Sequence, residues 1–163
     1  MKTIIVMRHA KADTESTTGN DFDRKLLKKG IVAAQSVAKK FQELGTVPDL
    51  IITSPVIRAK STAEIISDYF ELKDSTLIKS YLYNRLYTFS EIVDDIISFR
   101  NDSKIVLIVG HNPTLSYLMQ QIHKPTNETL RTSSGVVFNF DTDNWSDVLT
   151  TECKRTFSFE RED

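Results

Sequence analysis

The sequence predicts an α/β fold, a three-layer α/β/α sandwich with a mainly parallel central sheet. Short apolar runs alternate with stretches of helical periodicity, which is typical of strand-helix units that build a parallel sheet. The runs at 3–7 and 104–109 are rich in Ile, Val or Leu, and their apolar residues are consecutive rather than alternating, as in strands that are covered on both faces. No linker, repeat or low-complexity tract interrupts the chain, so we expect a single domain over residues 1–163.

Four strands and a first helix are expected in the N-terminal two thirds of the chain. The strands are predicted at 3–7, 50–53, 76–78 and 104–109. Between the first two, apolar residues recur at helical spacing from Leu26 to Leu44, and Gly45 follows as a stop signal. The spacing therefore predicts a helix over 26–44.

Three further helices have recognisable start signals. Ser54-Pro55 follows the second strand and predicts a helix with Ser54 as N-cap and proline in its first turn. The segment 88–91 has the spacing of a capping box and opens the next helix. Asn112-Pro113 repeats the cap-plus-proline signal after the fourth strand. Helices are thus expected directly after the second and fourth strands.

The C-terminal part has a different pattern. Residues 135–140 read as a strand, 141–144 as a turn, and 152–159 as a final strand that is antiparallel at the sheet edge. Trp145 and the aromatic residues of this region are expected in the core. Cys153 is expected as a buried or half-buried strand residue.

Composition excludes several classes of partner and location. The chain has 21 Lys+Arg against 22 Asp+Glu, a formal net charge of -1, so its overall charge does not favour nucleic acid or an anionic membrane. No apolar segment approaches the length of a membrane span. A single cysteine cannot form an internal disulfide, and the N-terminal apolar run is too short for a signal peptide. We therefore expect a cytoplasmic protein.

Histidines and arginines follow the predicted strands at their carboxyl ends. Arg8-His9 comes after the first strand, Arg58 lies in the helix after the second, and His111 follows the fourth. In open α/β sheets, ligands bind at this edge. The two arginines suit the oxygens of a phosphoryl group, and the helix N-termini there favour an anion. His9 is placed to attack phosphorus, and His111 to stabilise charge or donate a proton.

These residues lie in motifs that resemble the histidine phosphatase superfamily, with the SixA-like phosphohistidine phosphatases as the most similar branch. The resemblance is carried by Met7-Arg8-His9-Ala10-Lys11-Ala12, by Ser54-Pro55-Val56-Ile57-Arg58-Ala59 with Thr62-Ala63, by Val109-Gly110-His111-Asn112-Pro113, and by Asp23-Arg24 through Leu27 and Gly30. It implies a phosphoglycerate mutase-like fold.

The resemblance also implies roles for the site residues. His9 would be the nucleophile that carries the phosphoryl group, and Arg8, Arg58 and His111 would line the phosphate pocket. It implies no metal and no cofactor. Asn112 matches a position beside the pocket, although a plain helix cap is the preferred interpretation.

Arg24 leaves two interpretations open. Together with Asp21 and Asp23, it either borders the pocket or only starts a helix with favourable acids.

The sequence lacks an acidic residue directly after the third predicted strand. Branches of the superfamily that cleave phosphoesters carry an acidic residue after the third strand, to protonate the leaving alkoxide. The stretch 80–87 contains no carboxylate, and Glu91 is assigned to the capping box. An imidazole leaving group needs less help, so the sequence favours a protein phosphohistidine substrate, such as a phosphotransfer domain, over a small phosphoester. A phosphate or sulfate ion is expected to fit the pocket, and the short joints around the third strand indicate an open site.

Alternative interpretations remain. A general phosphomonoesterase would take its proton from water, Asp13 or Glu15, and a binding module would hold phosphoproteins without turnover. A metal site made by three histidines is disfavoured because His123 lies at the far end of a helix, where a structural role is expected. Tyrosines 81, 83 and 87 fit either the rim of the site or the core.

Overall fold

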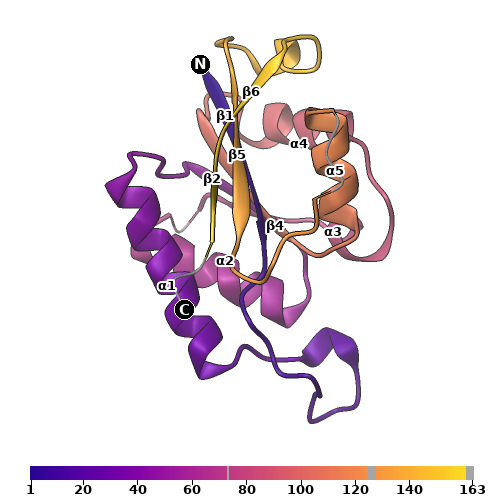
Figure 1. Ribbon diagram of the computed structural model, residues 1–163. Coiled ribbons are helices and arrows are strands. Elements are labelled where there is room, and N and C mark those ends of the chain that lie inside the picture. The colour runs from indigo at the N-terminus through magenta and orange to yellow at the C-terminus, as the bar shows by residue number, and fades with distance from the viewer. Residues whose placement is uncertain (73, 125–127, 161–163) are drawn as a thin grey trace.

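A six-stranded sheet forms the middle layer of the molecule (Figure 1). The computed structural model describes residues 1–72, 74–124 and 128–160. In sheet order the strands are β3 (Thr76–Ile78), β2 (Leu50–Thr53), β4 (Ile105–Gly110), β1 (Lys2–Arg8), β5 (Gly135–Phe140) and β6 (Cys153–Phe159). The first four strands are parallel to one another. Strand β5 pairs antiparallel with β1, and β6 pairs antiparallel with β5. The mainly parallel sheet and the antiparallel edge are confirmed.

Helices cover both faces of this sheet. The pair α1 (Lys28–Glu43) and α2 (Ile57–Tyr69) packs on one face, and α3 (Tyr81–Asn84), α4 (Phe89–Arg100) and α5 (Thr114–Ile122) lie on the other (Figure 1). Two 3-10 helices, η1 (Asp21–Asp23) and η2 (Trp145–Asp147), complete the elements described. The three-layer α/β/α sandwich predicted from the sequence is therefore confirmed.

The middle of strand β1, residues 4–7, is apolar at every position because both faces of the strand are covered. Ile4 and Val6 belong to the core beneath α4 and α5, whereas Ile5 and Met7 belong to the core beneath α1 and α2. Successive side chains on a strand point to opposite faces, so a strand between two helical layers needs an apolar residue at every position.

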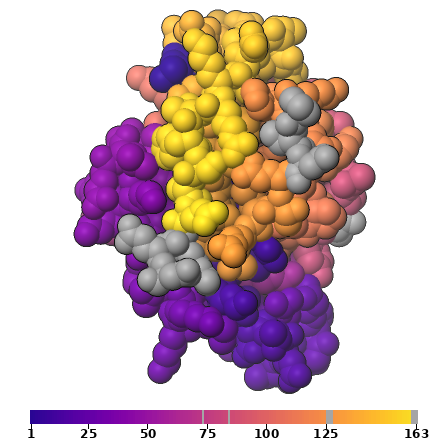
Figure 2. Space-filling model, viewed as in Figure 1, coloured from indigo at the N-terminus to yellow at the C-terminus, as the bar shows by residue number. Residues whose placement is uncertain are grey.

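Parallel pairing brings the functional segments to one edge. Arg8, the last residue of β1, pairs with Gly110 at the end of β4, and Thr53 at the end of β2 pairs with Val109. The residues that follow these three strands therefore emerge side by side. The segment after β1, up to α1, forms the lower end of the molecule in Figures 1 and 2.

The helix predicted to start at Ser54 begins later. Helix α2 starts at Ile57, and its N-cap residue is Val56, which has an extended backbone with φ -67° and ψ 143°. The Ser54 hydroxyl accepts a hydrogen bond from the Val56 amide at 3.4 Å and lies 3.0 Å from Nε2 of His111. The prediction of Ser54 as N-cap is wrong because its side chain is turned to the site instead.

The preferred interpretation of Asn112 is also wrong. Helix α5 begins at Thr114 with Pro113 in the N-cap position, and no side chain caps it. The Asn112 amide nitrogen donates instead to the carbonyl of Leu130 at 2.8 Å. Asn112 therefore ties the β4–α5 joint to the segment before β5.

Other local predictions hold. Helix α4 has the capping box, with Thr88 and Glu91 bonding each other's backbone amides. Trp145 and Cys153 are buried, as expected. Within the described part of the chain, no helix is long and apolar enough to cross a membrane.

Candidate active site

The predicted site residues converge on one pocket at the carboxyl end of the parallel strands. It has a volume of about 280 Å³. Its lining consists of Arg8, His9, Lys11, Ala12, Thr14, Arg24, Arg58, His111, Asn112 and Thr132. Every residue predicted for the site is in this set, including Arg24 and Asn112, for which other interpretations were open.

His9 is buried in the turn directly after β1. Its Nδ1 lies 2.8 Å from the carbonyl oxygen of Ala10. Because a carbonyl only accepts, Nδ1 carries the proton and Nε2 keeps its lone pair. The turn is itself held, since the Ala10 amide donates to the Thr62 hydroxyl at 3.0 Å.

Burial, with a smaller effect from nearby arginines, lowers the pKa of His9 to about 4, although its bond to Ala10 opposes the shift. At neutral pH His9 is therefore an uncharged ring with a free basic nitrogen. That is the state a nitrogen nucleophile needs.

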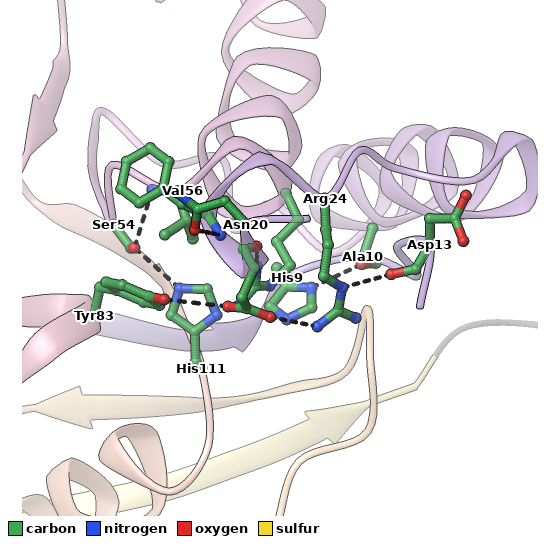
Figure 3. A network of polar contacts seen from close by, with 12 residues as sticks. His9, Ala10, Asp13, Asn20, Arg24, Ser54, Val56, Tyr83 and His111 are labelled. Atoms are coloured by element: carbon green, nitrogen blue, oxygen red, sulfur yellow. Dashed lines mark hydrogen bonds and ion pairs between the residues drawn. The ribbon is translucent and has the colours of Figure 1, made fainter. Parts of the chain in front are cut away.

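His111 faces His9 across the pocket (Figure 3). The ring centroids are 5.0 Å apart, and Nε2 of His111 lies 3.0 Å from the Ser54 hydroxyl. Its Nδ1 is buried and has no hydrogen-bond partner. Burial, together with the neighbouring His9, lowers the pKa of His111 to about 3. An anion in the pocket would favour the protonated ring, so His111 has the position of a donor that charges on ligand binding.

The arginines present unpaired donors in the same pocket. Arg8 donates from Nη1 to the Leu130 carbonyl at 3.0 Å, and Arg58 donates from both Nη atoms to Asp21. The Nε atoms of Arg8 and Arg58 are buried without a partner, like Nδ1 of His111. A buried donor left unpaired costs about 1–3 kcal/mol. Two such arginine donors in residues lining one pocket, together with the unpaired Nδ1 of His111, therefore indicate an anion site.

Asp21 links the two pocket-lining arginines Arg24 and Arg58. Its carboxylate accepts from Arg24 Nη1 and from Arg58 Nη2, each at 2.8 Å, and from the Tyr83 hydroxyl at 3.2 Å. Hydrogen bonding to Arg24, with a further contribution from Arg58, lowers the pKa of Asp21 to about 2. The sequence places Asp21 near Arg24, but no local pattern indicates its contact with Arg58, 37 positions away.

The three tyrosines after β3 divide between site and core. Tyr83 packs edge-on against His111, with ring centroids 5.6 Å apart. Tyr81 and Tyr87 are buried in the core beneath α4 and α5. Tyr83 therefore contacts a residue that lines the pocket.

The two side-chain proton donors considered for a phosphomonoesterase do not line the pocket. Neither Asp13 nor Glu15 lines it. Asp13 accepts from Arg24 through its backbone carbonyl, and its carboxylate points away from His9 in Figure 3. Among the described residues, no three His, Cys, Asp or Glu side chains are grouped closely enough to hold a metal ion.

Comparison with known proteins gives matches over part of the sequence and over the entire fold. Residues 4–78 match the model of the histidine phosphatase superfamily, branch 1. An uncharacterised protein of Picosynechococcus sp. is 40% identical over 60 residues, which are 37% of this chain and 36% of that protein. The chain thus spans about a third of the curated relative that it matches.

Solved structures share the fold along nearly the entire chain. A protein described as phosphohistidine phosphatase SixA from Nakamurella multipartitia superposes with a TM-score of 0.79 at 18% identity, covering 98% of this chain and 96% of the other. The protein histidine phosphatase SixA complexed with tungstate gives 0.76 at 19% identity, covering 96% and 95%. The family-model match and the shared fold confirm the resemblance of this chain to the histidine phosphatase superfamily.

Proposed function

We propose that this protein is a phosphatase that hydrolyses phosphohistidine on another protein, through a phosphohistidine intermediate on His9. The observation that carries the proposal is a neutral histidine with a free Nε2 in a pocket with two buried, unpaired donors, on Arg8 and Arg58, and the unpaired Nδ1 of His111. The family match and the fold support a phosphatase. The tungstate in a SixA neighbour is an oxyanion and agrees with such a pocket.

In the first step, Nε2 of His9 attacks phosphorus and the phosphorus–nitrogen bond of the substrate breaks. Arg8 and Arg58 bind the phosphoryl oxygens, and His111 stabilises the charge that spreads over them. The leaving imidazole keeps the electron pair of the broken bond, and solvent protonates its second nitrogen. In the second step, water attacks the phosphorus on His9, and Nε2 leaves with its lone pair restored. The net reaction consumes one water and releases phosphate.

The chemistry of the rim favours an imidazole leaving group. Asp21 is the carboxylate nearest to the donors of Arg58, but with a pKa of about 2 it is an anion at neutral pH and has no proton to give. Burial and the bond to Asp21 raise the pKa of the Tyr83 phenol, which makes it a weaker acid. Without a general acid, cleavage of a phosphoester would lose a rate enhancement of about 10²–10⁴-fold. Cleavage of a phosphoramidate would lose a smaller rate enhancement.

The proposed reaction needs no metal. The positive charge that stabilises the phosphoryl group comes from Arg8, Arg58 and a protonated His111, and the nucleophile is a side chain rather than a metal-bound water. Activity should therefore persist in EDTA.

The test measures phosphate release in EDTA from a phosphohistidine-bearing phosphotransfer domain and from an aryl phosphate. The proteins are the wild type, His9→Ala and, as a matched control, His123→Ala, which changes the histidine at the end of α5. We expect fast release from the protein substrate, slow release from the ester, and loss of both in His9→Ala alone.

Other outcomes would contradict the proposal in different ways. Preference for the ester would mean that a proton donor acts in the site and that the protein is a phosphomonoesterase. Phosphate binding without any turnover in the wild type would indicate a phosphoprotein-binding module. Loss of activity in EDTA, restored by a divalent cation, would contradict metal independence.

A further inference from the structure

The carboxylate of Asp21 occupies donors that a phosphoryl group would use. It accepts from Nη1 of Arg24 and from Nη2 of Arg58, and its backbone carbonyl accepts from Nη1 of Arg58 at 2.7 Å. Both arginines line the pocket. A carboxylate and a phosphoryl group compete for the same guanidinium geometry, because each presents two oxygens to the paired N–H groups of arginine.

The two partners in the Asp21–Arg58 pair differ in exposure. The Arg58 side chain is 7% exposed and that of Asp21 is 48% exposed. Water can therefore hydrate the Asp21 carboxylate when it leaves the pair. The Arg58 guanidinium stays in the wall of the pocket, where its charge needs an anion as partner. Because solvent screens the half-exposed Asp21 carboxylate, an incoming dianion can replace it at modest cost.

The segment that carries Asp21 is attached to the core at its base. The Asp13 amide donates to Lys25, and the Leu27 amide donates to Lys11, on either side of a bridge between Ala12 and Leu26. Between these points most side chains from 13 to 21 are exposed. A loop with a fixed base and an exposed middle can move its tip without disturbing the strand that holds His9.

We propose that Asp21 is a specificity-determining residue: a resident anion that competes with the substrate's phosphoryl group for Arg24 and Arg58. The inference rests on the proposed function, because it concerns the same pocket. Competition lowers the affinity for every oxyanion, including the product phosphate. A phosphohistidine on a protein surface has further contacts to offset this loss, whereas free phosphate and small phosphates do not. Asp21 thus favours macromolecular substrates and assists product release.

A purely positioning role for Asp21 predicts the opposite sign. If the carboxylate only held Arg58 and Tyr83 in place, its removal would loosen both side chains and weaken anion binding. If it competes, removal frees the N–H groups of Arg24 and Arg58 and strengthens anion binding. The direction of the change therefore decides between the two roles.

The experiment measures binding of inorganic phosphate and of tungstate by isothermal titration calorimetry, at neutral pH and low salt. The central variant is Asp21→Asn, which keeps the shape of the side chain and removes its charge. The matched control is Asp23→Asn, which removes the same charge from the same 3-10 helix, where Asp23 accepts from the Thr18 hydroxyl instead. We expect Asp21→Asn to bind both anions about five- to tenfold more tightly and the control to stay within about twofold of wild type.

A second variant keeps the inference testable if Asp21→Asn folds poorly. Tyr83→Phe removes one donor to Asp21 without changing any charge, so it should release the carboxylate more easily and strengthen phosphate binding by about twofold. Weaker or unchanged anion binding in Asp21→Asn would overturn the inference, and so would an equal gain in Asp23→Asn.

The failure of this inference is distinguishable from that of the proposed function. If wild type binds neither anion and releases no phosphate from phosphohistidine, the proposed function is wrong. If wild type binds and hydrolyses but Asp21→Asn shows no gain in affinity, only the role of Asp21 is wrong. Kinetics give a second readout, since the inhibition constant for phosphate should fall in Asp21→Asn by the same factor as its dissociation constant.

Discussion

Acid should weaken the folded protein through the two histidines of the pocket. The pKa is about 4 for His9 and about 3 for His111 in the folded state, against 6.5 for an ordinary histidine. Between about pH 6.5 and pH 4, the unfolded chain therefore binds protons that the folded chain does not. A group that binds more protons when unfolded makes stability fall as pH falls, so the free energy of unfolding should decrease through this window.

The size of the effect follows from the proton count. Between pH 6 and pH 5, an unfolded histidine is mostly protonated, while His9 and His111 remain mostly neutral in the folded state. Because one proton per pH unit corresponds to about 1.4 kcal/mol, each histidine should contribute about 1 kcal/mol of lost stability over that unit. The pair should contribute about 2 kcal/mol.

The assay is urea denaturation of wild type and His9→Gln at pH 7, 6 and 5. Wild type should lose about 2 kcal/mol between pH 6 and 5, and His9→Gln about half of that. Added phosphate should reduce the loss in wild type, because an anion in the pocket favours the protonated rings. Equal pH slopes in wild type and His9→Gln, without phosphate, would refute the argument that burial keeps His9 neutral.

Two further substitutions test how the pocket is supported. Gly30→Ala should destabilise the protein by more than about 2 kcal/mol in urea denaturation, because a Cβ at Gly30 would overlap the backbone carbonyl of Lys11. A free energy of unfolding within about 0.5 kcal/mol of wild type would contradict that contact. Ser54→Ala should lower kcat about tenfold with little change in KM, because Ser54 bonds His111 rather than the substrate; a kcat equal to that of wild type would exclude this role.

The sheet and the position of the pocket could be predicted because they depend on short-range patterns. A strand covered on both faces must be apolar at each position, which is why β1 and β4 stand out in the sequence. Once parallel pairing is assumed, the residues after these strands must meet at one edge. Arg8, His9 and His111 were therefore predictable as neighbours without any knowledge of side-chain contacts.

The contacts that determine charge in the pocket were not predictable in this way. The structure pairs Arg58 with Asp21 from η1. This contact depends on how a mostly exposed loop folds back over the sheet edge. Loop conformation has no periodicity to reveal it, and the turn residues around Asn20 indicate only a local bend.

The start signals of the helices show where local rules fail and why. Thr88, at the start of α4, caps its helix as predicted. Ser54 and Asn112, which precede the helices at the pocket, do not: one bonds His111 and the other bonds Leu130.

Because the side chains of Ser54 and Asn112 do not cap α2 and α5, both helix starts remain available to an anion. No side-chain oxygen caps α2 or α5, so the amide groups of their first turns are not neutralised by a cap and the positive ends of both helix dipoles remain available. An anion held by Arg58, in the first turn of α2, and by His111, just before α5, would supply the negative charge that no capping side chain provides at these two helix starts. The local rule thus fails at the two helix starts where a bound phosphoryl group would take the place of a capping side chain.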